Sequence, residues 1–336
     1  MTHPLAVFAA PQQDSHQNPT WHPEHRGRLD AAIAGIHEAD LDDATEWRIP
    51  ELVDVDDLAL VHDRVYIDKI EHLCAMGGGQ IDEDTSAAPG SWATARRAAG
   101  AVVQAVDALR NEECDLAFAA GRPPGHHAVP DRAMGFCLFN NAAVGAAKLA
   151  AAGERVAIVD WDVHHGNGTQ DIFYDDPNVL YISTHESPLY PGTGALHETG
   201  EGSGVGTNVN LPFPAGTAGD TFRAAFDEVV VPLIERFSPD WLFISAGFDA
   251  HRADPLAGLG LTAADYADLA VRLQALVPAR RLLVVLEGGY NLEALTYSSG
   301  ATLSALLGQQ YRPELASGGG DTGRPTVTAA KQLWEL

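Results

Sequence analysis

The stretch VAIVDWDVHHGNG, residues 156–168, joins an uninterrupted apolar run to a cluster of acidic and histidine side chains. An apolar run of this length, without alternating polar residues, is typical of a strand that is buried on both faces. Ligands of parallel sheets bind beyond the carboxyl ends of the strands. The stretch therefore predicts a buried strand over residues 156–159 and a functional site directly after it.

Similar apolar runs recur along the chain and alternate with segments that have a helical pattern. The runs occupy residues 5–9, 115–119, 179–183, 241–245 and 282–286. Helices are expected at residues 92–109, 141–152, 222–237, 263–277 and 292–307, the fourth with Thr262 as its N-cap. The alternation predicts an α/β fold with a mostly parallel sheet that is covered by helices on both faces.

No linker divides the 336 residues, so we expect one domain over residues 1–312 with a Gly-rich segment and C-terminal tail, residues 313–336, packed on it. Hydrophobic residues make up 46% of the chain and charged residues 20%, as in globular proteins with a large core. Neither a membrane-spanning apolar run nor a signal peptide is recognisable. The cysteines lack CxxC spacing and are expected to be reduced. These features predict a soluble, cytoplasmic protein without membrane contact.

The net charge of −25 limits the possible partners, because lysine occurs only at positions 69, 148 and 331. Nucleic-acid binding is not expected, since phosphates are bound by clusters of cations. The negative field either keeps the protein soluble or attracts cationic substrates, and the two interpretations are compatible.

Side chains with catalytic potential follow four of the predicted strands. In extended backbone, Asp162 and His164 point the same way, and Asp249 from another strand end could supply a third ligand. Two carboxylates and one imidazole suit zinc, and three protein ligands leave positions open for water and substrate, as in catalytic sites.

Two adjacent histidines and a tyrosine complete the predicted site. His126 and His127 follow a Pro-Pro-Gly turn and are placed to provide a general base and an electrostatic partner. Tyr290 follows two glycines that let the backbone bend closely around a ligand, and its hydroxyl could stabilise an oxyanion. Cys137 is interpreted as a small packing residue and not as a nucleophile.

Six segments carry a resemblance to a known family. They are residues 122–128 (RPPGHHA), 135–141 (GFCLFNN), 160–169 (DWDVHHGNGT), 190–194 (YPGTG), 245–249 (SAGFD) and 287–291 (EGGYN). In this order, within a similarity that runs from about residue 14 to 308, they closely resemble the histone deacetylase and acetylpolyamine amidohydrolase superfamily, in its class II-like bacterial branch. The resemblance implies a single-domain arginase/deacetylase fold with a central eight-stranded sheet. It also implies hydrolysis of an acylated amine by metal-activated water.

The resemblance assigns roles to individual residues. Asp162, His164 and Asp249 would bind zinc, and a potassium ion would lie beside it, near Asp160 and Ser183. His127 would be the general base and acid, His126 its electrostatic partner, and Asp160 the residue that orients His126. Asn167 would be the partner of the second histidine, where class I relatives have aspartate, and Tyr290 would polarise the scissile carbonyl. The substrate would be bound by Phe136 and Tyr190 as walls of the acyl tunnel, Gly135 and Gly289 as neighbours of Phe136 and Tyr290, and Leu256 as a residue of the substrate rim.

The substrate class stays open between acyl-lysine peptides and small acylated amines such as acetylpolyamines. Leu256 stands where eukaryotic polyamine deacetylases carry a gatekeeper glutamate, which favours acyl-lysine. Asp14, Asp82, Glu83 and Asp84 could instead form an acidic rim. The histidines at positions 16, 22 and 25 are expected in an exposed entrance loop.

Two further classes of function are weighed against a deacylase. A metal-retaining module that binds acyl-lysine without turnover is disfavoured by Tyr290, since relatives with histidine there deacetylate poorly. An arginase-like enzyme with two manganese ions would need a second set of carboxylate ligands, which the sequence does not offer. The sequence does not decide the oligomeric state, and a homo-oligomer is compatible with it.

Overall fold

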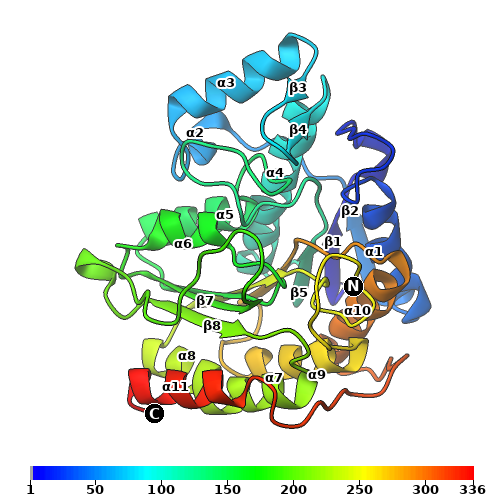
Figure 1. The fold of residues 1–336 in the computed structure, drawn as a ribbon. Coiled ribbons are helices and arrows are strands. Elements are labelled where there is room, and N and C mark those ends of the chain that lie inside the picture. Colours follow the sequence, from blue (N-terminus) through cyan, green and yellow to red (C-terminus); the bar gives the residue numbers. More distant parts are fainter. Residues whose placement is uncertain (1–2) are drawn as a thin grey trace.

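The computed structural model describes residues 3–336, so residues 1 and 2 of the expected domain lie outside the described part. Its centre is an eight-stranded sheet in which all neighbouring strands are parallel (Figure 1). The strands, in the spatial order β2-β1-β5-β10-β9-β6-β7-β8, are Thr45–Arg48, Leu5–Phe8, Leu116–Ala119, Leu282–Leu286, Trp241–Ala246, Val156–Asp160, Val179–Glu186 and Asn208–Phe213. The predicted eight-stranded α/β fold is confirmed.

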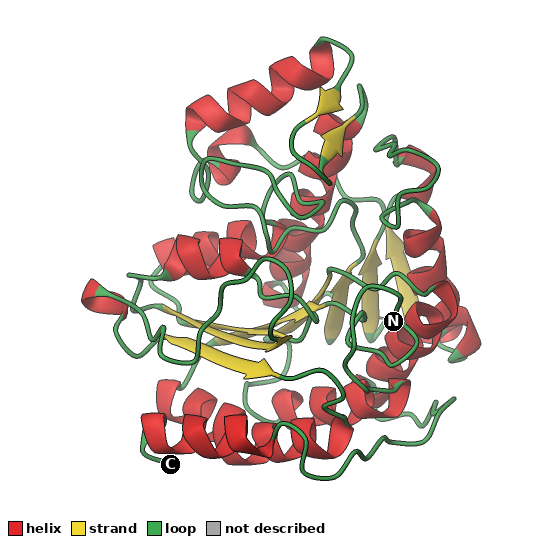
Figure 2. Ribbon diagram, viewed as in Figure 1, coloured by secondary structure: helices red, strands yellow, loops and turns green. Residues whose placement is uncertain are grey.

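Helices cover both faces of this sheet, and long loops join them to the strands (Figure 2). One face carries α1 (Gly27–Glu38), α7 (Gly219–Ala225), η4 (Phe226–Val230), α8 (Val231–Phe237), α9 (Ala263–Gln274), α10 (Leu292–Leu306) and α11 (Arg324–Trp334). The other carries α2 (Val55–Leu58), α3 (Arg64–Ala75), α4 (Ser91–Arg110), α5 (Asn141–Ala151) and α6 (Asn167–Phe173). The remaining elements are the hairpin β3 (Gly79–Gln80) and β4 (Ser86–Ala87), and the 3-10 turns η1 (Pro11–Gln13), η2 (Asp42–Ala44) and η3 (Gly202–Gly204).

Each inner strand contributes to two hydrophobic cores because its successive side chains point to opposite faces of the sheet. In β1, Leu5 and Val7 lie in the core under α1 and α10, while Ala6 and Phe8 lie in the core under α3 and α4. This is why apolar residues dominate the six inner strands, although β7 ends in Ser-Thr-His-Glu.

The two edge strands were not predicted, and their sequences explain why. Strand β2 reads Thr-Glu-Trp-Arg and β8 reads Asn-Val-Asn-Leu-Pro-Phe, so neither is a continuous apolar run. A strand at the edge of a sheet has one neighbour, and there polar residues and proline are tolerated.

The helix expected over residues 222–237 is divided into α7, the π-helical segment η4 and α8. Pro232 lies in the first turn of α8 and has no N–H to donate to the preceding turn, which accounts for a wider turn directly before it. Thr262 caps α9 as predicted, and its side chain forms a reciprocal capping box with Asp265.

After α10 the chain runs past α9 and α7 and ends in α11, which packs against β8 (Figure 1). Val327, Ala330 and Trp334 are buried beneath this last helix. Arg324 and Lys331 pair with Glu228 of η4. Within residues 3–336, no helix combines the length and the hydrophobicity needed to cross a bilayer.

Candidate active site

The site lies where the central strands β5, β10, β9 and β6 end side by side. Since these strands are parallel, the loops after their carboxyl ends meet at one edge of the sheet. These loops contain the four segments with catalytic potential, which are far apart in the sequence.

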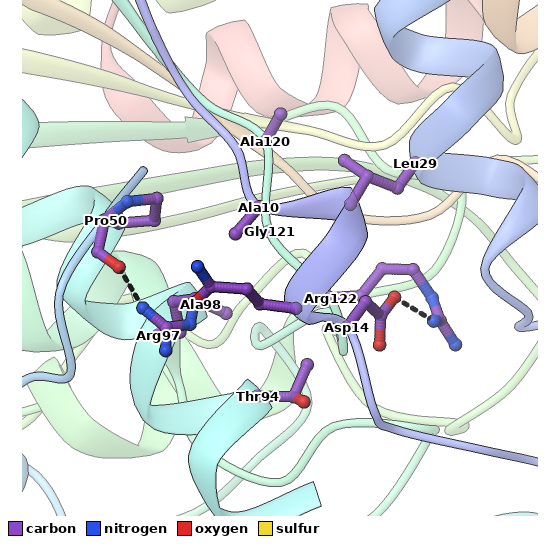
Figure 3. A pocket seen from close by; sticks show the side chains of 11 residues that line it. Ala10, Asp14, Leu29, Pro50, Thr94, Arg97, Ala98, Ala120, Gly121 and Arg122 are labelled. Carbon is purple, nitrogen blue, oxygen red and sulfur yellow. Dashed lines mark hydrogen bonds and ion pairs between the residues drawn. The ribbon is translucent and has the colours of Figure 1, made fainter. Parts of the chain in front are cut away.

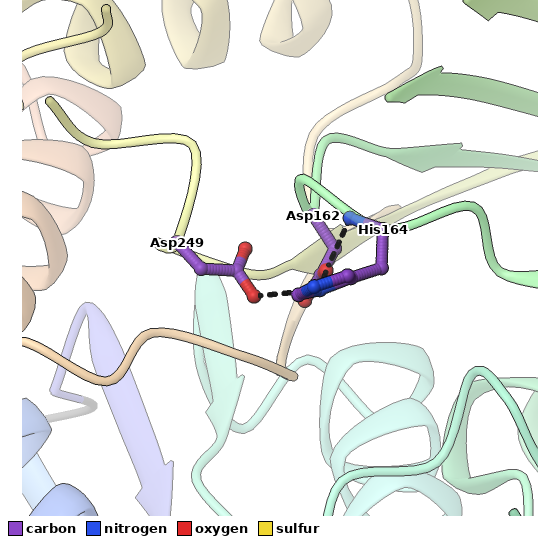
Figure 4. A group of neighbouring side chains, drawn as sticks. All are labelled: Asp162, His164 and Asp249. Carbon is purple, nitrogen blue, oxygen red and sulfur yellow. Dashed lines mark hydrogen bonds and ion pairs between the residues drawn. The ribbon is translucent and has the colours of Figure 1, made fainter. Parts of the chain in front are cut away.

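Three of the predicted ligands meet at the centre of this edge (Figure 4). The Nδ1 atom of His164 lies 3.1 Å from Oδ1 of Asp162 and 3.2 Å from Oδ2 of Asp249. One ligand atom from each residue lies within 4.8 Å of the others, and all three residues are buried. Strand β6 ends at Asp160, so Asp162 and His164 converge from a bend and not from the extended backbone that the sequence suggested.

The backbone is shaped closely around these carboxylates. A Cβ atom on Gly247 would come within 2.0 Å of Asp162 Oδ2, and one on Gly288 within 2.1 Å of Asp249 Oδ2. Backbone N–H groups of Gly288 and Val163 donate to Asp162 Oδ2 (2.8 Å) and Asp249 Oδ1 (2.9 Å). Glycine is therefore required at both positions.

The charges of this cluster fit a bound cation. Asp249 Oδ2 is buried and, apart from His164 Nδ1 at 3.2 Å, has no hydrogen-bonding neighbour within the described chain, which leaves this carboxylate oxygen available to a ligand. Burial lowers the pKa of His164, but its hydrogen bonds to Asp162 and Asp249 outweigh this and raise the pKa to about 10. Burial and the neighbouring Asp162 raise the pKa of Asp249 to about 7. The cluster thus attracts positive charge, and a set of two carboxylates and one imidazole suits zinc.

The two adjacent histidines have different partners. His126 Nδ1 lies 2.9 Å from Asp160 Oδ2, whereas His127 Nδ1 lies 2.8 Å from Asn167 Oδ1. Burial lowers the pKa of both, but Asp162 and Asp160 raise that of His126 well above its usual value. The pKa of His127 stays well below its usual value because of burial and the nearby His126 and His164. A cationic and a neutral imidazole therefore lie side by side, with ring centroids 4.0 Å apart.

Glu287 holds the turn that precedes these histidines. Its Oε2 atom accepts the backbone N–H groups of Gly125 (2.7 Å) and His126 (3.1 Å), and its Oε1 atom accepts the Ser245 hydroxyl (3.0 Å). A buried carboxylate with three donors fixes the loops after β5 and β10 relative to each other and to the end of β9.

A tunnel of about 200 Å³ leads from the surface to this cluster. It is lined by Asp84, His127, Gly135, Phe136, His164, Leu189, Tyr190, Leu256 and Tyr290. The ring of Tyr190 meets His127 edge-on with centroids 5.1 Å apart, and Phe136 meets Tyr290 edge-on at 5.7 Å. The walls are therefore largely apolar and aromatic, and the floor carries the polar groups.

Unusual backbone conformations shape the tunnel wall. Gly135 and Phe136 both have positive φ, 55° and 69°, and a Cβ atom on Gly135 would come within 2.4 Å of His127 Cδ2. A positive φ at phenylalanine is strained, and such strain is found at sites where the surroundings require one geometry. Gly289, with φ 116°, gives the same freedom to the loop before Tyr290.

Tyr290 is partly buried at the floor of the tunnel. Burial raises the pKa of its hydroxyl well above the usual value, so the group is protonated and can donate a hydrogen bond. The guanidinium of Arg28 lies 4.7 Å from the centre of its ring.

A buried ionic network beneath Tyr290 was not predicted. Arg28 donates to the carbonyls of Gly289 (2.7 Å) and Glu287 and to Glu24 Oε1 (3.1 Å). Glu24 also accepts hydrogen bonds from the guanidinium of Arg122, which donates a further hydrogen bond to Asp14. The partners Arg122 and Glu24 are 98 residues apart, so no local pattern could have revealed their contact.

This network bounds a second, small cavity of about 20 Å³ (Figure 3). Arg122 and Asp14 lie together on one side, and Arg97, held by the carbonyl of Pro50, lies on the other. The expectation that Asp14 lines the substrate rim is therefore wrong, because its side chain is buried against Arg122.

The entrance histidines differ from the prediction as well. His25 is exposed, but His16 and His22 are only 3% and 5% exposed. His16 Nδ1 lies 2.7 Å from Ser91 Oγ, and His22 Nε2 lies 2.9 Å from the carbonyl of Asp84. His16 thus joins the N-terminal segment to the start of α4, and His22 joins it to the loop that contributes Asp84 to the tunnel.

The remaining residues of interest lie around the floor. Ser183 is the neighbour of Asp160 across strands β6 and β7, and its Oγ atom lies 2.9 Å from His185 Nδ1. His165 contacts Thr193 and Gln170, and His251 contacts Glu314, so both are engaged outside the cluster of Asp162, His164 and Asp249.

The chain matches known proteins over nearly all of its length. Residues 22–306 match the family model of the histone deacetylase domain. A probable deacetylase of Archaeoglobus fulgidus is 41% identical over 325 residues, covering 92% of this chain and 90% of the relative. A histone deacetylase-like amidohydrolase of Pseudomonas aeruginosa is 40% identical over 259 residues, covering 75% and 68%. The crystal structure of the HDA15 HD domain matches with a TM-score of 0.91 at 37% identity, covering 98% of this chain and 95% of that chain.

Proposed function

Because the chain belongs to the histone deacetylase family, we propose that it is a zinc-dependent hydrolase that removes acetyl groups from acetyl-lysine-type substrates. The observation that carries the proposal is the convergence of His127, His164 and Tyr290 on the floor of one apolar tunnel. Asp162, His164 and Asp249 would hold the ion. When bound, zinc would polarise the amide carbonyl and lower the pKa of a water molecule.

His127 is suited to act as the general base and acid. Its Nδ1 atom is engaged with the side-chain oxygen of Asn167, which leaves the Nε2 lone pair free to accept a proton. The same nitrogen then returns this proton to the leaving amine, so that an amine and a carboxylate are released. His126, bound to Asp160, places a positive charge next to His127 and lowers its pKa, so that His127 passes the accepted proton on to the leaving amine.

Tyr290 and Arg28 support the charge that develops on the substrate oxygen. The Tyr290 hydroxyl is protonated and donates to the carbonyl oxygen as that oxygen becomes negative. Arg28 fixes the Gly289 carbonyl just before this tyrosine and lies against its ring. The tyrosine is thus held before the substrate arrives, which avoids a reorganisation cost during the reaction.

The shape of the tunnel supports a lysine-like substrate. Phe136, Leu189, Tyr190 and Leu256 provide an apolar lining that suits the methylene stem of an acylated lysine. Asp84 at the same tunnel favours the alternative of an acetylpolyamine, because its carboxylate would attract a second amine of the substrate. We place acyl-lysine first because Leu256, and not an acidic residue, lines the wall at the gatekeeper position.

A potassium ion next to the zinc site is also part of the proposal. Asp160 and Ser183, on adjacent strands at the same level, offer the oxygen ligands that a hard cation needs. Exchange of potassium for a large organic cation in the buffer is expected to lower the melting temperature, and an unchanged temperature would count against this site.

The test is steady-state hydrolysis of a fluorogenic acetyl-lysine peptide alongside acetylputrescine, with zinc-loaded protein and with or without a hydroxamate chelator. Hydroxamate-sensitive turnover that favours the peptide is the expected result. Faster turnover of acetylputrescine would replace the lysine substrate by the polyamine. Binding of the acetylated peptide without turnover of either substrate would instead indicate a binding module.

A further inference from the structure

The segment after α10 crosses the loop that leads from Asp249 to α9, and Glu314 is its main contact. One carboxylate oxygen of Glu314, Oε2, accepts His251 Nε2 at 2.7 Å and the backbone N–H of Ala263 at 3.0 Å. The other, Oε1, accepts Arg252 Nη2 at 2.7 Å. The Glu314 side chain is 14% exposed and that of His251 is 4% exposed. This is a largely buried anchor on the outer side of the loop, and it lies beyond the stretch that matches the family model.

The inner side of the same loop is bonded to the backbone of Tyr290. Asp254 Oδ2 accepts the N–H groups of Tyr290 (2.7 Å) and Asn291 (3.2 Å), and its Oδ1 accepts the N–H of Leu256 (3.0 Å). Asn291 returns a bond from its side chain to the carbonyl of Ala253 at 3.0 Å. The position of Tyr290 is therefore tied to the position of Asp254.

Hydrogen bonds within the loop join these two sides. His251 accepts the N–H of Ala253 at Nδ1 (3.1 Å), and the carbonyl of His251 accepts the N–H of Asp254 (2.8 Å). A continuous path of bonds thus runs from Glu314 through His251 and Asp254 to the backbone of Tyr290.

We propose that Glu314 is a positioning residue that holds the loop of residues 250–256 and, through Asp254, sets the placement of Tyr290 for the reaction. The inference rests on the proposed function of Tyr290. Without Glu314, His251 and Arg252 lose their common acceptor and their link to the N–H of Ala263 at the start of α9, and the backbone bonds to Leu261 are left to hold this side of the loop. A displacement of about 1 Å at a reacting group can cost about 100-fold in rate, so a partial loss of this support is expected to have a measurable effect.

The test uses the full zinc-loaded chain with Glu314→Ala and Glu314→Gln. We expect Glu314→Ala to lower kcat about tenfold and to change KM by less than about twofold, and Glu314→Gln, which keeps one acceptor oxygen, to have an intermediate effect. In a Tyr290→Phe background the hydroxyl is already absent, so Glu314→Ala should then lower kcat by less than about twofold. An undiminished loss in that background, or an unchanged kcat in the single variant, overturns the proposal.

The matched control is Glu228→Ala, which removes two ion pairs from the same C-terminal part of the chain but lies away from the tunnel. Hydrogen exchange followed by mass spectrometry gives a readout that does not depend on turnover. In Glu314→Ala, the amides of residues 250–256 and 288–292 should exchange faster than in the wild type. In Glu228→Ala, the exchange rates of these two segments should be unchanged, and residues 324–334 should exchange faster instead. If the wild-type chain hydrolyses neither substrate, the proposed function fails, and hydrogen exchange alone tests the coupling between Glu314 and the backbone of Tyr290. Unchanged exchange of residues 288–292 in Glu314→Ala then refutes this coupling.

Discussion

The floor of the tunnel and its rim are held in different ways. Asp162, His164 and Asp249 at the floor are at most 9% exposed, and backbone N–H groups fix both carboxylates. At the rim, Tyr190 is 37% exposed and is held by edge-on contacts of its ring. The loop of Asp84 is bonded mainly to itself and to the N-terminal segment.

This contrast separates the part of the site that sets the chemistry from the part that selects the substrate. A buried polar group must have its partners supplied by the protein, so each residue at the floor depends on several others. A partly exposed group can be satisfied by water, so the rim can change at little cost in stability. Substitutions at the floor should therefore act on kcat by large factors, and substitutions at the rim on KM by small ones.

The largest effect is expected for Asp249→Asn at the floor. The free carboxylate oxygen becomes an amide group and negative charge is lost, so bound zinc should fall far below one per chain. We expect kcat to fall by more than about 1,000-fold, beyond the effect of one lost oxyanion donor. Metal content by mass spectrometry and kcat are the measurements. Asp227→Asn, at a half-exposed surface ion pair, is the control, and a fully metal-loaded Asp249→Asn enzyme would show that Asp249 is not a ligand.

Tyr290→Phe should have the next largest effect. The substitution removes one hydrogen-bond donor from the developing oxyanion, and we expect a decrease in kcat of about 100- to 1,000-fold with normal zinc content. Tyr297→Phe removes a hydroxyl that contacts Glu293 on the surface of α10 and serves as the control. If Tyr290→Phe retained more than about a tenth of wild-type kcat, the oxyanion would have to be stabilised by other groups.

The same contrast explains what could be predicted from the sequence. The inner strands begin with apolar runs, so their places and the cluster of Asp162, His164 and Asp249 after them followed from pattern and motif. Strands β2 and β8 were missed because edge strands carry polar residues. The network of Glu24, Arg28 and Arg122 was missed because it is formed by contacts between distant segments, and Asp14 was wrongly placed at the rim for the same reason.

A moderate effect is expected for Asn167→Ala. Loss of the partner at Nδ1 would leave the ring of His127 free to rotate and to adopt the other tautomer, and comparable outer partners of catalytic groups contribute about 10- to 100-fold. We therefore expect kcat to fall by about tenfold while zinc content stays normal. Asn111→Ala, which removes an exposed asparagine at the end of α4, is the control. A variant with unchanged kcat would mean that packing alone orients His127.

The smallest effect is expected for Asp84→Asn at the rim. Its carboxylate is partly exposed, so its attraction for a cationic substrate is worth about 0.2–1 kcal/mol, as for other exposed ion pairs. KM for acetylputrescine should therefore rise by about 1.5- to 5-fold, while KM for a neutral acetyl-lysine peptide and kcat for both stay unchanged.

Salt and pH sharpen this last prediction. High salt screens exposed charges, so wild type and Asp84→Asn should converge in about 0.5 M salt. Burial and the neighbouring Asp82 raise the pKa of Asp84, so the attraction of this carboxylate for acetylputrescine should weaken as the carboxylate becomes protonated at falling pH. The ratio of kcat/KM for the two substrates is the quantity to measure, because a change in His127 affects both equally. Glu83→Gln, at an exposed neighbour that does not line the tunnel, should leave the ratio unchanged. A tenfold fall in kcat for Asp84→Asn would instead assign Asp84 to the floor, and the division between floor and rim would have to be drawn closer to the surface.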